Sequence, residues 1–341
     1  MRRIIATGLL GISSTLGVQA QTVISGAGST FDYPVFSAWF SAYAKTDPSL
    51  SFSYQPIGSG AGIRQIIART VDFGASDAPM TDDALAEAPG EILHLPVVTG
   101  GVAVVYNLLD GPKLRLDADT LAGIFMGTIT KWNDPRIAAI NPLAELPDYD
   151  VVVVHRNDSS GTTFIFTDYL CSVSPAWKSL IGRSMTVNWP VGLGAKGNAG
   201  VAGQVCQAPG AIGYAELSYA KSKQLQYADI KNDAGNYIPP TSESISAALA
   251  MALVPWDFRF SMVNTIGKNA YPISGASWIL IYKDQHDAVK GKKMVQFLRW
   301  AVTDGQKLSA ALNYAPLTDN MVRQILRKLD EVTYGSRRTT P

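Results

Sequence analysis

The sequence predicts an α/β fold with mainly parallel strands, organised in two domains. Short apolar runs alternate with helical patterns along the chain, and this alternation is typical of α/β proteins. The 341 residues exceed what one hydrophobic core comfortably holds, so about two domains are expected. Hydrophobic residues make up 47% of the chain, which is enough apolar surface to offset chain entropy and excludes a disordered protein.

The elements follow from the local patterns in chain order. Apolar or alternating runs predict strands at 22–28, 51–56, 71–76, 95–107, 151–156, 211–217 and 278–284. Helical spacing predicts helices at 34–45, 63–70, from 81 onward, at 117–127, 162–173, 292–312 and 319–335. Glycines beside extended runs, at 100–101 and 267–272, suit crossings between the domains. We therefore expect a discontinuous first domain, 21–99 plus 268–341, and a second domain, 100–267.

The first 20 residues read as a signal peptide. Arg2 and Arg3 precede an apolar stretch that is too short to span a bilayer, and Val18-Gln19-Ala20 has the small-x-small pattern of a cleavage site. The alternative is a buried N-terminal helix. Later in the chain no run of about 18 apolar residues occurs, so we expect an exported chain without a membrane span.

Charge and cysteine content exclude some functions and leave one question open. The 29 basic and 28 acidic residues give a net charge of +1, too little excess to bind nucleic acid. The histidines are scattered, so no metal site and no cofactor are expected. Cys171 and Cys206 allow one disulfide, which an oxidising compartment favours, or two unpaired thiols.

Three segments share one layout, in which a strand, a small polar glycine-rich turn and a helix follow one another. They are 26–31 (GAGSTF), 58–62 (GSGAG) and 158–162 (DSSGT). A helix start offers unpaired N–H groups and a partial positive charge, and glycine lets a ligand approach the backbone. One such turn is usually only a helix cap, but three in one α/β chain indicate an anion held by convergent helix starts.

Charged residues sharpen this hypothesis. Arg156 ends a predicted strand just before the third turn, where it can grip an oxyanion, and Asp158 can orient it. The alternative is a surface Arg–Asp pair of little value. Asp77 follows the 71–76 strand and would point to the same edge, although an Asx-turn before Pro79 fits equally well.

Six blocks resemble the periplasmic phosphate-binding proteins of bacterial phosphate ABC transporters, the PstS family. They are GAGSTF, YQPIGSGAGIRQIIARTVDFGASDAPM, RNDSSGTTFIFTDYL, WPVGLGAKGNAG, PGAIGYAE and ISGASWILIYKDQ, and the resemblance runs from about Ile24 to Ile325. It implies a type II periplasmic binding protein, with two lobes that each hold a mainly parallel sheet flanked by helices and a cleft between them. The implied location is the periplasm.

The resemblance also implies the ligand-binding residues. Donors to phosphate would come from Thr30, the backbone N–H of Phe31, Ser59, Ser160, Gly161 and Thr162, with Arg156 as the ligand-binding arginine, Asp158 as its partner and Asp77 as the acceptor carboxylate. This sequence departs from the family at Ser29, Asp32 and His155, and the cysteine pair is not a general family feature. None of these departures is expected to touch the inferred ligands.

The resemblance implies a receptor rather than an enzyme, with no catalytic residue. Phosphate keeps a proton near neutral pH, and Asp77 can accept a hydrogen bond from it. Sulfate has no such proton, so its oxygen and the carboxylate would face each other as two buried acceptors. The partners implied are inorganic phosphate, arsenate as a competitor, and a membrane-embedded ABC permease with its ATPase subunits. The receptor itself is expected to be a monomer.

Some patterns and rival functions are less favourable. Residues 192–197 match G-x-G-x-x-G, but Trp189-Pro190 interrupts the preceding strand, so a close-packed turn is the better interpretation. Residues 218–221 match S-x-x-K without its companion motifs. An exported phosphatase would use the same helix starts but needs a metal cluster or an activated nucleophile. A sulfate or molybdate receptor is disfavoured by Asp77, and an adhesion or signalling role would leave no mark in the sequence.

Overall fold

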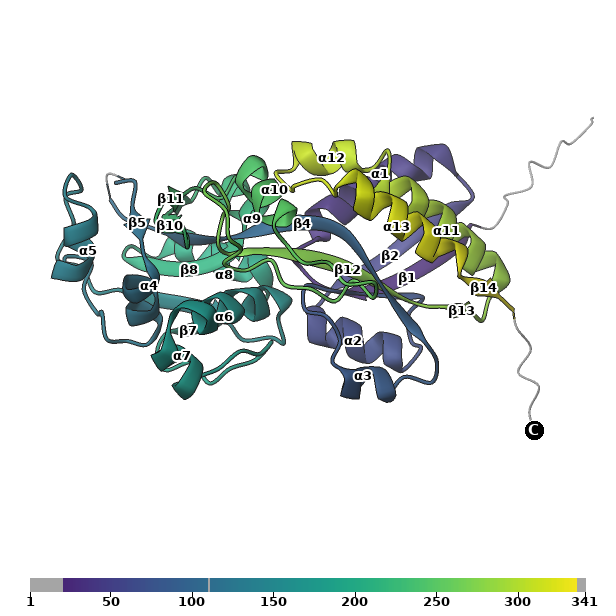
Figure 1. The fold of residues 1–341 in the computed structure, drawn as a ribbon, viewed down its shortest axis with the longest axis horizontal. Helices are drawn as coiled ribbons and strands as arrows, with labels where there is room; N and C mark the ends of the chain where they lie inside the picture. Colours follow the sequence, from purple (N-terminus) through teal and green to yellow (C-terminus); the bar gives the residue numbers. More distant parts are fainter. Residues whose placement is uncertain (1–20, 110, 336–341) are drawn as a thin grey trace, which may run out of the picture.

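The computed structural model describes residues 21–109 and 111–335, and the predicted signal peptide lies outside them. Two α/β lobes lie side by side and are joined by two long strands, β4 and β12 (Figure 1). All the larger strands form one continuous nine-stranded sheet in the order β2-β1-β3-β12-β4-β8-β6-β7, with β9 also paired to β4. Among the helices of this described part, none has the length and apolar character needed to cross a membrane.

The first lobe combines the start and the end of the described chain. Figure 1 shows both in one half of the molecule, the start in purple and the end in yellow. Its elements are β1 (Thr22–Gly28), α1 (Tyr33–Thr46), β2 (Leu50–Pro56), α2 (Ser59–Ile67), β3 (Phe73–Ser76), α3 (Asp82–Ala86), β13 (Asp284–Gln285), α11 (Ala288–Val302), α12 (Gln306–Ala311), α13 (Asp319–Asp330) and β14 (Thr333–Tyr334). β1 pairs in parallel with both β2 and β3, so three strands end at the same edge of the sheet.

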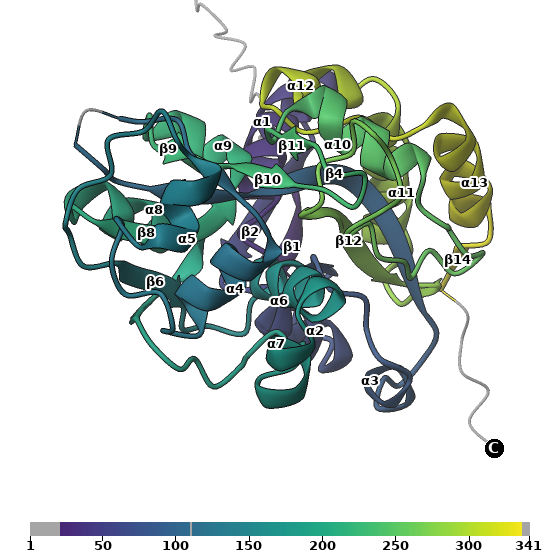
Figure 2. The same cartoon turned by 60° about the vertical axis from the view of Figure 1, so that its left-hand side comes forward.

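The second lobe is built from the middle of the chain (Figure 2). Its elements are β5 (Arg115–Leu116), α4 (Ala118–Phe125), α5 (Pro135–Ile140), β6 (Val152–Arg156), α6 (Gly161–Val173), α7 (Pro175–Leu180), β7 (Leu193–Ala195), α8 (Gly197–Gln207), β8 (Ala211–Glu216), α9 (Leu217–Ser222), β9 (Gln226–Tyr227), β10 (Asp229–Lys231), β11 (Tyr237–Ile238) and α10 (Ser242–Ala250). β6 pairs in parallel with β7 and β8, which again brings strand ends to one edge.

The strands between the lobes are antiparallel and fully buried. β4 (Ile92–Tyr106) pairs with β12 (Ser274–Tyr282) as far as Gly101 and with β8 from Val102 onward. The change of partner lies between Gly101 and Val102, directly after the glycine pair at 100–101. The exact domain limits, 21–99 plus 268–341 and 100–267, stay a prediction.

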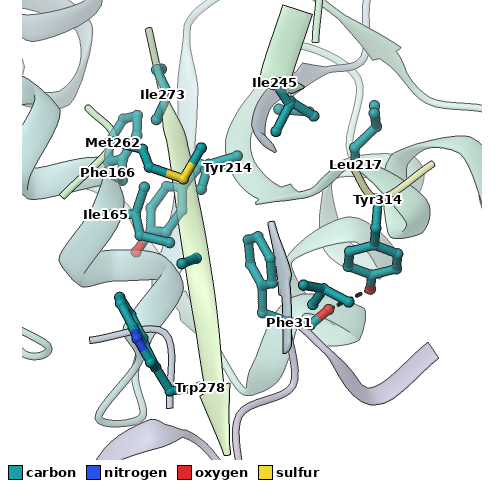
Figure 3. Close-up of a cluster of buried hydrophobic side chains, with 14 of the residues drawn as sticks. Phe31, Ile165, Phe166, Tyr214, Leu217, Ile245, Met262, Ile273, Trp278 and Tyr314 are labelled. Atoms are coloured by element: carbon teal, nitrogen blue, oxygen red, sulfur yellow. Dashed lines mark hydrogen bonds between the residues drawn. The ribbon is translucent and has the colours of Figure 1, made fainter. Parts of the chain in front are cut away.

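An apolar cluster lies around these strands where the lobes meet. In Figure 3, Ile165 and Phe166 lie on one side of the strand that carries Trp278, and Phe31 and Tyr314 lie on the other. All five side chains are at most 4% exposed. The predicted strands and helices are present with two differences. The expected 292–312 helix divides into α11 and α12 around Gly305, and the expected 319–335 helix ends at Asp330, with Thr333–Tyr334 forming β14 instead.

The structure corrects the prediction of a disulfide, because Cys171 and Cys206 are both free thiols. Cys171 lies on α6 and Cys206 on α8. The site of a Cβ on Gly213 in β8 faces Val201 and Val205 of α8, while the neighbouring Tyr214 stacks on Phe166 of α6. Since successive strand residues point to opposite faces, the two helices cover opposite faces of the sheet and their thiols cannot meet.

The second correction concerns residues 192–197. They form β7 and the turn into α8, not merely a close-packed turn, and α8 begins at Gly197 with a φ of +69°. The interruption at Trp189-Pro190 ends before the strand begins. This strand–turn–helix unit therefore adds a helix start that sequence analysis did not assign to the site.

Candidate functional site

The predicted site residues meet at the facing strand ends of the two lobes. β1, β2 and β3 end in the first lobe and β6 and β7 end in the second, and a helix follows four of these ends closely. The side chains or backbones brought together there are buried: Thr30, Phe31, Ser59, Asp77, Arg156, Ser160, Gly161 and Thr162. The eight residues that the sequence grouped as one site therefore lie together in the structure. Their roles toward a ligand are a matter for the proposal below.

The first turn is shaped by Gly28 and Ser29. Gly28 has a φ of +143°, and a Cβ there would lie 2.0 Å from the carbonyl oxygen of Ala75, so only glycine fits. Ser29 follows with its hydroxyl directed inward, where it accepts a hydrogen bond from the N–H of Phe31 at 2.8 Å. The backbone donor assigned to phosphate by resemblance is therefore engaged within the turn in this structure.

Asp77 is a buried carboxylate surrounded by hydroxyl groups. Its Oδ1 accepts from Ser29 Oγ at 2.5 Å and lies 2.8 Å from Ser277 Oγ, and its Oδ2 lies 3.4 Å from Ser59 Oγ. Burial raises the pKa of Asp77 to about 6, against the lowering effect of these hydroxyls and of the Arg156 charge. Asp77 is therefore ionised at neutral pH but within reach of protonation.

The expectation that the departures from the family pattern would not touch the inferred ligands is wrong for Ser29, and Asp32 lies one residue removed from them. Ser29 donates to Asp77 directly, and Asp32 reaches it through Ser277, whose Oγ lies 2.7 Å from Asp32 Oδ2. Both residues therefore belong to the polar network around this buried carboxylate. His155 stacks on Trp189, and its Nδ1 lies 3.1 Å from the backbone carbonyl oxygen of Arg156, so this departure contacts the backbone of a site residue.

Arg156 is fixed by a two-pronged bond to Asp158. Nε donates to Oδ1 at 2.7 Å and Nη2 to Oδ2 at 2.5 Å, while Nη1 lies 3.3 Å from Thr162 Oγ1. Burial raises the pKa of Asp158, but the hydrogen bonds and charge of Arg156 outweigh it and hold that pKa below its ordinary value. With an arginine side chain only 1% exposed, the surface-pair alternative does not apply.

The lobes contact each other through the helix starts. Ser59 Oγ of the first lobe accepts from Gly161 N–H of the second at 3.1 Å, and Gly60 N–H donates to the Ser159 carbonyl at 3.0 Å. Ser160 is the N-cap of α6 and accepts from Thr163 N–H. The space is tight, since a Cβ on Gly161 would lie 2.4 Å from Ser59 Oγ.

Sequence reasoning missed Asn198, on the first turn of α8. Its side-chain amide donates to Thr30 Oγ1 at 2.9 Å and to Thr162 Oγ1 at 3.1 Å, which links the two lobes. The neighbouring Gly197 N–H donates to Asp158. The signal that could have found them is the WPVGLGAKGNAG block, which was quoted for the resemblance but given no role.

A second missed group lies beside Phe31. Tyr314 donates to the carbonyl oxygen of Phe31 at 2.5 Å, as the dashed line in Figure 3 shows, and its hydroxyl lies 3.2 Å from Glu216. Burial raises the pKa of Glu216 to about 8, despite hydrogen bonds from Ser218 and Tyr314 that lower it. Glu216 therefore lies beside the site as a carboxyl group that is largely protonated at pH 7.

Two α/β lobes that meet through buried polar helix starts define a binding protein of the periplasmic receptor type. A family model described as PBP superfamily domain matches residues 17–304. The chain belongs to the PstS family of phosphate-binding proteins. It is 42% identical over 330 residues to the phosphate-binding protein PstS of Pasteurella multocida, covering 95% of this chain and 94% of that one. The family consists of receptors, so the chain is not an enzyme.

Other relatives agree with this assignment. The PstS protein of Xylella fastidiosa is 43% identical over 308 residues, covering 89% of this chain and 83% of the relative. The solved structure of a phosphate-binding protein from Stenotrophomonas maltophilia superposes with a TM-score of 0.72 at 19% identity, covering 90% of this chain and 94% of that one. At this identity the structural match supports the fold alone, and it agrees with the two-lobed fold expected from the sequence.

Proposed function

We propose that this protein is an exported receptor that binds inorganic phosphate between its lobes and delivers it to an ABC permease with its ATPase subunits. The observation that carries the proposal is the buried convergence of one arginine, one unpaired carboxylate and helix starts from both lobes. The names and family of the relatives support phosphate as the ligand. Export through residues 1–20, a periplasmic location and a monomeric state belong to the same proposal.

The residues divide into donors and one acceptor. Arg156 supplies charge and N–H groups, while Thr30, Ser59, Ser160 and Thr162 supply hydroxyls, and the starts of α2 and α6 supply backbone N–H groups, including that of Gly161. Phe31 N–H would exchange Ser29 Oγ for a phosphate oxygen. Because Asp158 already neutralises Arg156, much of the binding energy would come from hydrogen bonds and local dipoles.

Asp77 supplies the selectivity in this proposal. An ionised carboxylate can accept a hydrogen bond from the O–H group that phosphate keeps, but it repels an oxyanion without such a group. Sulfate would leave two buried acceptors facing each other, at a cost of roughly 1–3 kcal/mol or more. Arsenate has the same shape and protons as phosphate and should compete with it.

Calorimetry with both anions tests the proposal. Wild type should bind phosphate and not sulfate at pH 7. In Asp77→Asn the ratio of phosphate affinity to sulfate affinity should fall by about 100-fold, since the asparagine amide can donate a hydrogen bond to sulfate. The matched control is Asp72→Asn, which alters a half-buried aspartate that pairs with Lys290 away from the site. Absence of phosphate binding by wild type would reject the function, and an unchanged preference in Asp77→Asn would reject only the role of Asp77.

A further inference from the structure

A second carboxyl group lies behind Asp77 and has no part in the proposed function. Asp32 is fully buried and precedes α1 as its N-cap, yet its side chain makes no capping hydrogen bond. It turns instead toward Ser277 on β12, with Oδ2 at 2.7 Å from Ser277 Oγ. Because aspartate before a helix ordinarily caps it, this orientation needs a different explanation.

The explanation lies in how many protons three neighbouring oxygen atoms share: Asp32 Oδ2, Ser277 Oγ and Asp77 Oδ1. Ser277 Oγ lies 2.7 Å from Asp32 Oδ2 and 2.8 Å from Asp77 Oδ1, so both contacts have hydrogen-bond length. A serine hydroxyl carries a single proton and can donate to only one of these oxygens. The other contact then needs a proton from a carboxyl group, so one of the two aspartates is protonated.

The surroundings decide which aspartate carries it. Asp77 accepts from Ser29, whose proton is available because Ser29 itself accepts from Phe31 N–H, and it also feels the charge of Arg156. Among the described residues, the further side-chain hydrogen bond to Asp32 comes from Tyr54, at 3.4 Å, and the Tyr54 hydroxyl lies closer to the Ser29 carbonyl, at 2.7 Å. The ionised form is therefore better stabilised at Asp77.

The electrostatics agree with this geometry. Burial is the largest cause that raises the pKa of Asp32 well above its ordinary value, and the nearby Asp77 charge adds to it. The pKa of Asp77 is raised only to about 6. At pH 7 these shifts favour a neutral Asp32 beside an ionised Asp77.

We propose that Asp32 is a specificity-determining positioning residue that stays protonated and donates to Ser277, so that Ser277 donates to Asp77 and keeps it an ionised acceptor for the anion. Ser29 donates to the same Oδ1 from the other side. Oδ2 of Asp77 then remains for the ligand proton, with Ser59 at 3.4 Å. The selectivity part of this inference rests on the proposed phosphate-binding function, whereas the protonation of Asp32 does not.

Several titratable groups face Asp32 and Asp77, and the effects of their titration must be distinguished from those of the two aspartates. They lie on different elements: Tyr54 on β2, Arg156 on β6, Glu216 on β8, Tyr219 on α9 and Tyr314 after α12. Among them Glu216 is the one other buried acid whose pKa, at about 8, lies near neutrality. Glu216→Gln is therefore the necessary control.

The direct test is infrared spectroscopy of the full mature chain at pH 7, with the side-chain carboxyl of aspartate labelled with ¹³C. Wild type and Asp77→Asn should show a protonated aspartate C=O band, and Asp32→Asn should lack it. The label separates this band from that of Glu216. A band that survives in Asp32→Asn, or that disappears in Asp77→Asn instead, overturns the proposal whether or not phosphate is the ligand.

A binding measurement tests the connection through Ser277. Asp32→Asn keeps an N–H donor to Ser277, so phosphate affinity and sulfate exclusion at pH 7 should stay within about threefold of wild type. At alkaline pH, phosphate affinity should fall in wild type and in Glu216→Gln as Asp32 ionises, and this fall should be absent in Asp32→Asn.

Ser277→Ala removes the donor to Asp77 without altering either carboxyl group. Sulfate affinity at pH 7 should then rise about tenfold over wild type, because Asp77 gains a proton more readily. An unchanged sulfate affinity in Ser277→Ala, or an alkaline fall that persists in Asp32→Asn, contradicts the proposed donor chain. Either result would reject the donor chain alone if, in the same assay, wild type binds phosphate and Asp77→Asn loses its selectivity against sulfate. The proposed receptor function would then still stand.

Discussion

The two lobes contribute aspartates of opposite character to one site. Asp77, at the end of β3, is held by serine hydroxyls and its pKa is raised by burial to about 6. Asp158, after β6, is also poorly exposed, but the two-pronged bond from Arg156 holds its pKa below the ordinary value. Burial acts in the same direction on both carboxyl groups, so the difference comes from the partner.

The contrast is between a carboxylate that positions an arginine, Asp158, and one that has an oxygen available to a ligand, Asp77. Asp158 has its two oxygens bonded to Arg156 and accepts Gly197 N–H as well, so it orients the cation and has little left for a ligand. Oδ2 of Asp77 has one hydrogen-bond partner among the described residues, the Ser59 hydroxyl at 3.4 Å. Under the proposed function, the second lobe would attract the anion through Arg156, and the first lobe would distinguish anions with a proton from those without one through Asp77.

The largest effect is expected from removal of the positive charge of Arg156. Arg156→Met should weaken phosphate binding by roughly 1000-fold, because it deletes the charge-assisted donors and leaves Asp158 as a buried, unpaired charge, a loss of about 3–5 kcal/mol. Isothermal titration with phosphate measures this loss.

A surface pair with the same spacing provides the matched control. Arg136 donates to Asp134 through Nε and Nη2, but its side chain is 50% exposed. Exposed ion pairs contribute little, so Arg136→Gln should bind phosphate as wild type does. Equal losses in both variants would mean that Arg156 stabilises the fold and does not act in the site.

A smaller effect is expected from separating the lobes without removing a polar group. In Gly161→Ala the new Cβ would lie 2.4 Å from Ser59 Oγ and 2.7 Å from Asp77 Cβ, so the lobes must move apart. Overpacking of this kind costs about 1–3 kcal/mol, which corresponds to roughly a 5- to 150-fold loss of phosphate affinity.

The matched variant is Gly203→Ala on α8, where a Cβ would meet nothing within 4 Å. It should leave affinity unchanged. If Gly161→Ala also binds as wild type does, the contact between Gly161 and Ser59 is not part of the ligand-bound state.

Much of the fold and of the candidate site could be predicted from the sequence, because both rest on local patterns. Arg156 and Asp77 were placed at strand ends by the apolar runs before them, and Ser160 was recognised as part of a helix start. The eight buried residues of the site follow from these positions and from the family resemblance.

The remaining features depend on contacts between distant parts of the chain. Ser277 reaches Asp77 across 200 residues, and Asn198 reaches Thr30 across 168, so no local pattern reveals either pair. Asp32 was noticed only as a departure from the family, since a residue before a helix reads as a cap until its side chain is seen to point elsewhere. The disulfide was predicted from compartment alone, which carries no information about the faces of a sheet.

The smallest expected effect concerns pH and uses sulfate, which does not titrate near neutrality. With a pKa of about 6, Asp77 is ionised and repels sulfate above that pH, and it becomes a donor as pH falls below it. Sulfate affinity should therefore rise about tenfold from pH 7 to pH 5 in wild type, as measured by competition with phosphate at fixed ionic strength. Asp77→Asn should bind sulfate with no such dependence, because its amide donates at every pH. A wild-type sulfate affinity that is flat across this range would mean that Asp77 stays ionised throughout, and the contrast with Asp158 would then lie in geometry alone and not in proton affinity.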